Sequence, residues 1–303
     1  MRAFVIGAAG FLGTHLCQRL AASGSAVVGF DRREPAAAVP GVDWRRGDFA
    51  ETETVLAAGV GCDVAYLLAG ARSPSVAAVD DLAGIVAPSV RLLERIGETG
   101  IRRLVFVSSG GTVYGVRRES PIPETAPTDP ISAYGINKLA VEKYALMHGR
   151  RAGWQPCVLR LSNPFGAGQR SGQGQGVIPA FFKAALSGEP LTVIGDGSTV
   201  RDYVLVDDAA EAMVLAATAP LGDHCVLNIG SGVGRTVLDV ADMVERLVGR
   251  RPNRHFEPAR ATDVPSTVLD IRLASQVLDW RPLTSWEAAM ERTFHWYRRV
   301  ELS

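Results

Sequence analysis

The chain has 303 residues, of which 47% are hydrophobic, so it is long enough to bury a large core in one or two domains. Its 32 basic and 32 acidic residues give a formal net charge of zero, which argues against nucleic acid or a membrane surface as the partner. No apolar run approaches the ~20 residues of a membrane span, and the scattered cysteines and histidines predict buried thiols in a reducing, cytoplasmic setting and no metal site.

The chain begins with a predicted strand, a glycine turn and a helix, which leaves no room for a signal peptide. An apolar run at 2–6 precedes Gly7, Gly10 and Gly13, and apolar residues at helical spacing come next, from Thr14. Gly7 permits a tight turn, Gly10 lets the backbone approach a pyrophosphate, and Gly13 allows close packing of the helix, whose N-terminus faces the anion. A glycine-rich turn by itself could be only a turn, so the pattern needs support from the next strand of the chain.

That support comes from the end of the second predicted strand, at 26–30, where Asp31 is the next residue. A carboxylate at this place accepts hydrogen bonds from the adenosine ribose hydroxyls and repels a 2′-phosphate, which favours NAD over NADP. Arg32 and Arg33 weaken that preference, because an arginine here could accommodate the phosphate.

Further strands are predicted at 42–44, 63–70 and 103–109, with a long helix from about 80 to 97 between the last two. Alternating strands and helices are typical of a Rossmann-type, doubly wound parallel sheet of the α/β class. Such sheets bind ligands at the carboxyl ends of their strands. Ser108, Ser109 and Thr112 are therefore expected near Tyr134.

Tyr134 and Lys138 are four residues apart in a segment with a helical pattern, so their side chains share one face. An ammonium beside a phenol favours the phenolate, and the pair can then supply a base near neutral pH. The spacing alone also occurs on many solvated helices, and the preceding nucleotide-binding pattern is what favours the catalytic interpretation.

Taken together, these motifs resemble the extended short-chain dehydrogenase/reductase family, and within it the NAD-dependent nucleotide-sugar epimerases and dehydratases, most closely the UDP-sugar 4-epimerases. The similarity runs in order along the whole chain. It includes Gly7-x-x-Gly10-x-x-Gly13, Asp31, 47–49, 68–70, 108–115, Tyr134-x-x-x-Lys138, 159–166, 195–197, 200–210, 228–232, 263–265 and 278–282.

The resemblance implies roles for individual residues. Tyr134 would take the proton from a sugar hydroxyl, and Lys138 would hold the cofactor ribose and lower the pKa of the tyrosine. NAD would be regenerated in each cycle and stay bound. The expected cofactor contacts are Gly7, Gly10, Phe11, Leu12, Gly13, Asp31, Arg32, Asp48, Phe49, Leu68, Ala69, Gly70, Arg72, Tyr134 and Lys138.

For the nucleotide-sugar substrate, the resemblance implies that Asn163, Arg201 and Arg260 hold the diphosphate, since a guanidinium pairs two phosphate oxygens. Val177 and Thr192 match the pocket for the base, where ordinary packing is the alternative. For Arg201, the alternative is a structural ion pair with the adjacent Asp202.

Departures from the family pattern bear on the reaction. Gly110 stands where a sugar-binding hydroxyl is usual, so Ser109 or Thr112 must supply that contact. The absence of a carboxylate at 110–112 disfavours dehydration and decarboxylation. Ile85 and Pro88 replace a usual Asn and Gly near the nicotinamide.

Two further positions bear on the sugar. The small Thr267 would admit an N-acetyl group, and Arg170 would meet a sugar carboxylate. Both residues could equally lie on the surface.

Three functions remain open at this point. NAD-dependent epimerisation at C4 of a nucleotide hexose, with UDP as the expected nucleotide, is favoured. The alternative is an NAD(P)H-dependent reductase of a 4-keto nucleotide sugar, which Gly110 and Arg32 with Arg33 keep open. A silent dinucleotide sensor is the third, and Tyr134 and Lys138 argue against it.

The expected organisation has two parts. Residues 1–161 with about 202–232 form the NAD-binding domain, and 162–201 with 233–303 form a smaller α/β nucleotide-sugar-binding domain. The helices at about 80–97 and 133–149 pack between subunits in many relatives, so a homodimer is expected by analogy.

Overall fold

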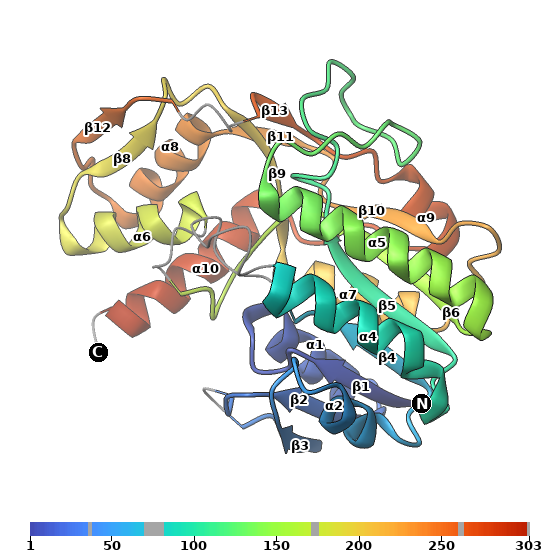
Figure 1. The fold of residues 1–303 in the computed structure, drawn as a ribbon. Helices are drawn as coiled ribbons and strands as arrows, with labels where there is room; N and C mark the ends of the chain where they lie inside the picture. Colours follow the sequence, from blue (N-terminus) through green and yellow to red (C-terminus); the bar gives the residue numbers. More distant parts are fainter. Residues whose placement is uncertain (36–37, 70–81, 171–175, 260–263, 302–303) are drawn as a thin grey trace.

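A computed structural model describes residues 1–35, 38–69, 82–170, 176–259 and 264–301. Its centre is a seven-stranded sheet in which all neighbouring strands run parallel (Figure 1). The strand order is β10-β6-β5-β4-β1-β2-β3, so the direction of winding reverses between β1 and β4. The strands are β1 (Arg2–Ile6), β2 (Ala26–Asp31), β3 (Val42–Arg46), β4 (Val64–Leu67), β5 (Arg103–Ser109), β6 (Gln155–Leu161) and β10 (Val226–Ile229).

The apolar runs of the central strands are buried on both faces, as a sheet covered by helices on each side requires. In β1, Ala3 and Val5 face one core, while Phe4 and Ile6 face the other. The first core is closed by α1 (Phe11–Ala22), α7 (Val206–Ala216) and α9 (Arg272–Leu278). The second is closed by α2 (Thr52–Gly59), α4 (Ala87–Arg95) and α5 (Ala133–Ala152), of which α4 and α5 lie side by side in Figure 1.

A smaller part of the chain has its own sheets and core. The short strands β7 (Asn163–Phe165), β11 (Gly234–Thr236) and β13 (Ser266–Thr267) all pair with β9 (Val200–Leu205), and β8 (Leu191–Ile194) pairs with β12 (Arg254–Glu257). The helices α6 (Val177–Ser187), α8 (Val237–Val248) and α10 (Trp286–Glu301) pack together around a core of Phe165, Phe182 and Tyr203. These elements lie beside the large sheet, next to its carboxyl edge (Figure 1).

The predicted long helix at about 80–97 is confirmed within the part described, although it is not α-helical throughout. The π-helical turn η1 (Leu82–Val86) leads directly into α4, because Val86 has α-helical φ and ψ, and the helical segment ends in the 3₁₀ turn η2 (Ile96–Thr99). Pro88 lies in the first turn of α4 and has no N–H to donate, so the change from π to α geometry coincides with a residue that cannot make the regular helical bond.

Two predictions about composition can be compared with the fold. Cys17, Cys62 and Cys157 are buried, Cys225 is half-buried, and all four are free thiols. Among the described residues, no helix is long and apolar enough to cross a membrane.

Candidate active site

The predicted glycine turn joins β1 to α1, and its geometry explains each glycine. Gly7 has a φ of 90°, in the region that favours glycine. A Cβ at Gly13 would overlap the carbonyl oxygen of Gly7 and lie 2.7 Å from Cα of Ala8. The first residue before α1, Gly10, offers no side-chain cap. The amides at this helix end are therefore available to an anion.

Asp31 is the last residue of β2, the strand that pairs with β1, and its side chain binds the backbone of the glycine turn. Its carboxylate accepts one hydrogen bond from the Ala9 amide and one from the Arg33 amide, each at 3.1 Å. A carboxylate offers about four acceptor sites, so two remain for ribose hydroxyls. Arg32, the residue expected beside the cofactor, is exposed.

The other described cofactor candidates come after neighbouring strands. Asp48 and Phe49 lie just beyond β3, while the amides of Leu68 and Ala69, after β4, both donate to the carbonyl oxygen of Ile6, at 3.0 and 3.1 Å. All lie at the carboxyl edge of the sheet, near the point where its winding reverses. Gly70 and Arg72 lie outside the described residues.

The predicted catalytic pair, Tyr134 and Lys138, is carried by α5, whose start is fixed by Ser132. The Ser132 side chain accepts a hydrogen bond from the Gly135 amide at 3.2 Å, as N-cap residues do. The Lys138 ammonium lies 5.8 Å from the centre of the Tyr134 ring and 5.1 Å from that of Phe106. It donates a hydrogen bond of 2.8 Å to the carbonyl oxygen of Val107. The helix therefore brings Tyr134 and Lys138 together, as their spacing predicts.

Burial shapes the electrostatics of Lys138. Removal from water lowers the pKa of its ammonium to about 8, and the negative charge of Glu142 acts in the opposite direction. A lysine in this range changes its charge just above neutral pH, so a small change in its surroundings alters how much of it is protonated.

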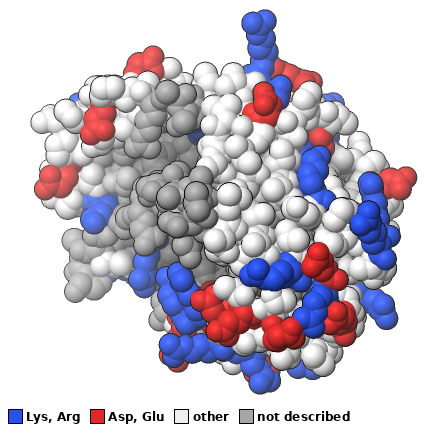
Figure 2. Space-filling model, viewed as in Figure 1, with Lys and Arg blue, Asp and Glu red and all other residues white. Residues whose placement is uncertain are grey.

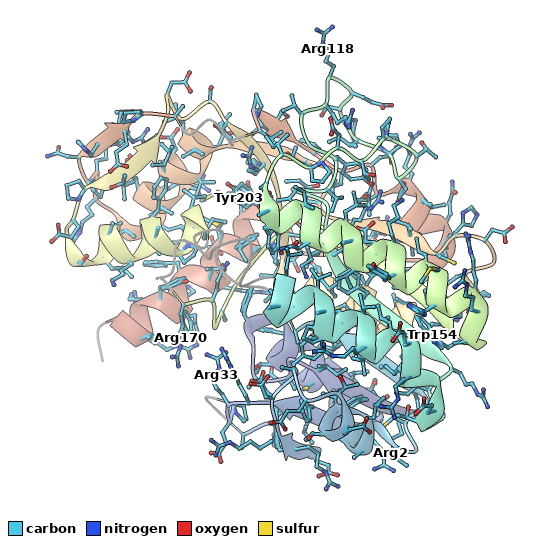
Figure 3. The ribbon with its side chains drawn as sticks, viewed as in Figure 1. Arg2, Arg33, Arg118, Trp154, Arg170 and Tyr203 are labelled. Carbon is cyan, nitrogen blue, oxygen red and sulfur yellow. The ribbon has the colours of Figure 1, made fainter. Side chains whose placement is uncertain are left out.

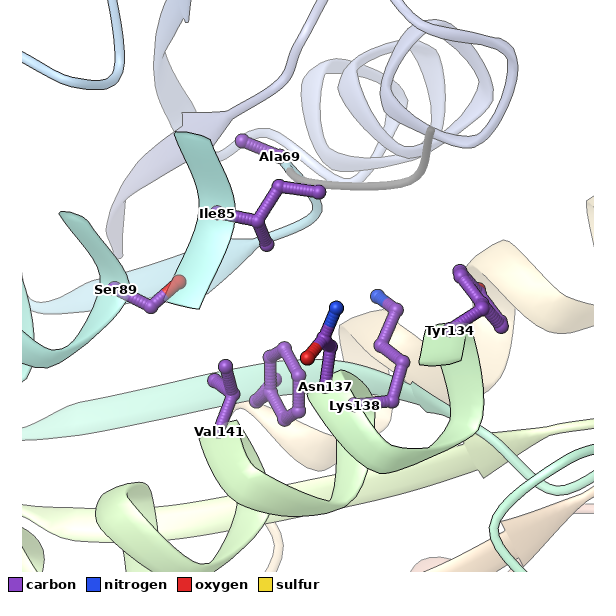
Figure 4. A pocket seen from close by; sticks show the side chains of 8 residues that line it. Ala69, Ile85, Ser89, Tyr134, Asn137, Lys138 and Val141 are labelled. Carbon is purple, nitrogen blue, oxygen red and sulfur yellow. The ribbon is translucent and has the colours of Figure 1, made fainter. Parts of the chain in front are cut away.

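A small pocket opens beside the Lys138 ammonium (Figure 4). Ala69, Ile85, Ser89 and Asn137 form part of its wall, and the Lys138 and Asn137 side chains point into it in Figure 4. The buried amide nitrogen of Asn137 has no hydrogen-bond partner among the described residues. An unpaired buried donor favours a polar group in this pocket. Ile85 supplies an apolar wall where the family pattern has an amide.

The structure explains the unusual Gly110. A Cβ at Gly110 would lie 2.5 Å from Cδ1 of Leu269 and 3.0 Å from the carbonyl oxygen of Arg160. A side chain at this position would therefore meet the packed core. Of the two hydroxyls expected to replace it, Ser109 ends β5 and is half-buried, and Thr112 packs against the first turn of α5 at Gly135. The Thr112 hydroxyl is buried and unpaired within the described part of the chain.

Ser108 was expected near Tyr134, but its hydroxyl has another partner. It donates to the buried carboxylate of Glu142, which also pairs with Arg160. Successive residues of a strand point to opposite faces, so Ser108 and Ser109 cannot both face the same ligand.

The candidate substrate residues lie on several elements. Asn163 in β7 donates through its side chain to the carbonyl oxygen of Asp202 at 3.0 Å, which leaves its amide oxygen as an acceptor. Val177 begins α6 and is half-buried, and Thr192 in β8 is exposed. Arg260 lies outside the described residues.

Arg201 does not need Asp202 to be held in place. Its guanidinium donates to the carbonyl oxygens of Val200 and Val264, at 2.9 and 2.6 Å. The Asp202 carboxylate accepts hydrogen bonds from the amides of Ser231, Gly232 and Leu269. Because adjacent strand residues point to opposite faces, the structure favours independent roles for Arg201 and Asp202 over an ion pair between them.

Sequence reasoning missed His15. Its Nδ1 contacts the Asp207 carboxylate and its Nε2 contacts the carbonyl oxygen of Ala167, both at 2.8 Å. Both partners only accept hydrogen bonds, so both ring nitrogens must carry protons. Burial lowers the pKa of His15, but the hydrogen bonds to Asp207 and Ala167 outweigh it and the net pKa is raised. His15 thereby ties α1 to the segment after β7.

Sequence reasoning also missed the pair of Glu142 and Arg160. A clue was available, because Glu142 comes four residues after Lys138, and Arg160 interrupts an apolar strand. Neither residue type is buried without a partner.

The residues present fit a dinucleotide such as NAD. The turn leaves no room for a side chain at Gly7 or Gly13, and the start of α1 keeps its amides open to a diphosphate. Asp31 has acceptor sites for a ribose, and the buried Lys138 is a donor. Figure 3 shows Tyr203 between the two halves of the molecule, with Arg33 and Arg170 extending from opposite halves toward the same side.

Comparison with known proteins supports this geometry. A sequence model of the NAD-dependent epimerase/dehydratase family matches residues 3–230. The chain is 33% identical to UDP-glucose 4-epimerase of Mycolicibacterium smegmatis, and the alignment covers 98% of this chain and 99% of that protein.

Two solved structures have the same fold. UDP-glucose 4-epimerase of Thermotoga maritima, solved with UDP-glucose, superimposes with a TM-score of 0.93 at 31% identity, over 99% of this chain and 100% of the other. UDP-glucose 4-epimerase of Thermus thermophilus, in complex with NAD, gives a TM-score of 0.88 at 31% identity, over 98% and 99% of the two chains.

Proposed function

This chain belongs to the NAD-dependent epimerase/dehydratase family, and from that premise we propose that it interconverts the C4 epimers of a UDP-hexose. The reaction is NAD-dependent and passes through a transient 4-keto sugar. The observation that carries the proposal is the pairing of Tyr134 with a buried Lys138 at the carboxyl edge of the sheet, beside the glycine turn. Relatives with this fold include 4-epimerases of UDP-glucose.

Tyr134 is the acid and base of this reaction. Its phenolate removes the proton of the C4 hydroxyl and later returns it, while the charge of Lys138 favours the phenolate. Bound NAD supplies the hydride acceptor and donor at the sugar carbon. Lys138 binds the cofactor ribose through the donors that its hydrogen bond to Val107 leaves available. Ser109 or Thr112 donates to the sugar oxygen, and the unpaired buried hydroxyl of Thr112 supports the second choice.

The diphosphate is held by Arg201 with Asn163 and Arg260, because guanidinium groups bind phosphate oxygens in pairs. The half-buried position of Val177 at the start of α6 supports a contact with the base, and Thr192 is assigned to the same region.

The work is divided between two parts of the chain. Residues 1–161 with about 202–232 hold NAD, and 162–201 with 233–303 hold the nucleotide sugar. The interleaved boundary is supported by β10, which joins the large sheet, and by α7, which packs on α1.

The working assembly is a homodimer formed through α4 and α5. Ile136 and Tyr144 on α5 are 53% and 39% exposed, and the face over the first part of α5 carries few charged side chains in Figure 2. Exposed apolar residues on one face favour a self-complementary contact. Sedimentation equilibrium of the wild type and of I136E tests this: the wild type is expected as a dimer and I136E as a monomer. A monomeric wild type would contradict it. The four free thiols support a cytoplasmic location.

The direct test uses the purified protein without added cofactor. Denaturation is expected to release NAD, and the intact enzyme is expected to interconvert a 4-epimer pair when given UDP-glucose, UDP-GlcNAc or UDP-glucuronic acid. An empty site, with turnover of a 4-keto sugar alone and only when NADH or NADPH is supplied, would instead establish the reductase.

A further inference from the structure

Behind the catalytic pair lies a fully buried ion pair that the proposed reaction does not use. Glu142 on α5 is 0% exposed and Arg160 on β6 is 4% exposed. The Arg160 Nη2 donates to Glu142 at 2.8 Å and its Nε lies 3.2 Å from both carboxylate oxygens. The Ser108 hydroxyl donates to the same carboxylate. This carboxylate thus has several charge-assisted or polar partners, which fix its position.

The arginine is held as firmly as the carboxylate. Its guanidinium stacks on the ring of Tyr114 at 4.8 Å and donates to the Tyr114 hydroxyl at 3.0 Å. That hydroxyl donates in turn to Asn228 on β10 at 2.7 Å. The network therefore connects α5 to three strands of the sheet, and the charge of Glu142 has a fixed position.

Glu142 lies one helical turn after Lys138, on the same face of α5. Among the described residues that line the pocket beside the lysine, Ala69, Ile85, Ser89, Phe106 and Val141 carry no charge. Tyr134 is a titratable neighbour of the lysine, and Arg160 is the ion-pair partner of Glu142. Among the described residues, Glu142 is the acid whose charge acts on Lys138.

We propose that Glu142 is a positioning residue for the reaction: its buried carboxylate keeps the Lys138 ammonium charged at working pH, and Arg160 limits the strength of that effect. The inference rests on the roles proposed for Tyr134 and Lys138. An opposite charge close to a buried lysine favours the protonated form, and a like charge disfavours it. Without Glu142, burial would favour a neutral lysine, which no longer stabilises the phenolate.

Glu142 and Arg160 therefore have opposite effects on the protonation of Lys138, although the two residues belong to one hydrogen-bonded network. E142Q removes the favourable charge and leaves Arg160 unopposed, so the protonation midpoint of Lys138 is expected to fall by about one pH unit. R160M leaves the carboxylate without its neutralising partner, so the midpoint is expected to rise. A purely structural pair would give the same loss of stability in both variants and no opposite shifts.

The chain offers a direct readout, because it contains only three lysines, Lys138, Lys143 and Lys183. Lys143 and Lys183 are exposed and serve as internal references. Protein labelled with ¹³C and ¹⁵N in lysine is titrated by NMR through the side-chain Cε and Nζ signals, in the form in which it purifies. Wild-type Lys138 is expected to titrate near pH 8. E142D keeps the charge and is expected to restore most of the wild-type midpoint.

An E142Q midpoint equal to that of the wild type, or shifts of E142Q and R160M in the same direction, would overturn the proposal. Should E142Q not fold, E142Q/R160M leaves neither buried charge unpaired, and its Lys138 midpoint is still expected to lie below the wild type.

Activity gives a second readout. The alkaline limb of kcat/KM is expected to move to lower pH in E142Q and to higher pH in R160M. A wild type that epimerises no UDP-sugar would contradict the proposed function, while the NMR titration would still decide the role of Glu142.

Discussion

The candidate contacts for the cofactor and those for the sugar nucleotide are organised differently. The cofactor contacts lie at the ends of successive strands of one sheet, and short loops hold them through backbone hydrogen bonds such as those of Leu68 and Ala69 to Ile6. The sugar contacts are spread over β7, α6, β8 and β9, which come from two small sheets and a helix. The first set is fixed by local geometry, and the second depends on long-range packing.

This difference predicts how each side responds to change. A substitution in the glycine turn meets backbone atoms, which cannot move away at low cost. A substitution among the sugar contacts removes a single side chain and leaves the supporting sheet intact. Substitutions in the glycine turn should therefore lower the amount of bound NAD, whereas substitutions among the sugar contacts should lower the affinity for the sugar nucleotide.

The largest effect on activity is expected for Y134F, because Tyr134 is the residue expected to act where the cofactor and the sugar come together. Loss of the phenolic oxygen removes the acid and base, so epimerisation is expected to fall by about 10²- to 10⁴-fold. Bound NAD, measured after denaturation, and the unfolding temperature are expected to stay near wild type. A variant that retains a tenth of the wild-type rate would contradict the role of Tyr134.

Next comes the glycine turn, tested by G13A with G97A, outside the candidate site, as its control. A methyl group at Gly13 overlaps the Gly7 carbonyl, whereas the nearest atom to one at Gly97 is Cδ1 of Trp154 at 3.4 Å, an ordinary contact. G13A is expected to lose most of its bound NAD and about 1–3 kcal/mol of stability, and G97A much less. Released NAD per chain and chemical denaturation measure both. Equal NAD contents would show that the turn tolerates more than its geometry indicates.

On the sugar side, R201M is compared with R235M. The two arginines are register partners in β9 and β11, but Arg235 lies over the ring of Trp286, at 5.6 Å. Loss of a charge-assisted phosphate contact is expected to raise KM about 10- to 100-fold in R201M, with little change in kcat. R235M is expected to stay within about twofold of the wild-type KM. An equal rise in KM in both variants would contradict a specific role of Arg201 in binding the diphosphate.

The smallest effect concerns stability. The pKa of Lys138 is about 8 in the folded chain, below its value of about 10.4 in an unfolded chain. Between these values the unfolded state binds more protons, so this lysine makes the free energy of unfolding rise with pH, by about 3 kcal/mol over the full interval. K138M lacks this contribution.

Urea denaturation at pH 7.5 to 10 is expected to show that the advantage of K138M over the wild type shrinks as pH rises. A constant difference would mean that the lysine titrates normally.

Much of the fold could be predicted from local patterns. The strands at 2–6, 26–30 and 103–109 are apolar runs bounded by glycines or polar residues, and the structure confirms them with small changes at their ends. The change from π- to α-helix beside Pro88 was not predicted, because the helical periodicity continues through the proline. The pairing of Tyr134 with Lys138 was predictable because it lies within one helix.

The rest of the site depends on contacts that no local pattern contains. Arg160 and Glu142 form an ion pair although they are 18 residues apart in the sequence, and His15 contacts Asp207 at a separation of 192 residues. The core around Leu269 fills the space beside Gly110, and only the folded chain shows why a hydroxyl there would not face a ligand. The hydrogen bond from Ser108 to Glu142 was not predicted for a related reason, since Glu142 lies on another element.

The carboxylate of Asp31 has a consequence for redesign. Because it holds the Ala9 and Arg33 amides as well as lying where a ribose is expected, replacing it to admit NADP would also release the glycine turn. A variant such as D31S would lose cofactor affinity altogether before it gained a new preference. A change of preference from NAD to NADP needs a hydrogen-bond acceptor at residue 31 that keeps the bond to the Ala9 amide. Arg32 or Arg33 would then pair with the negative charge of the 2′-phosphate.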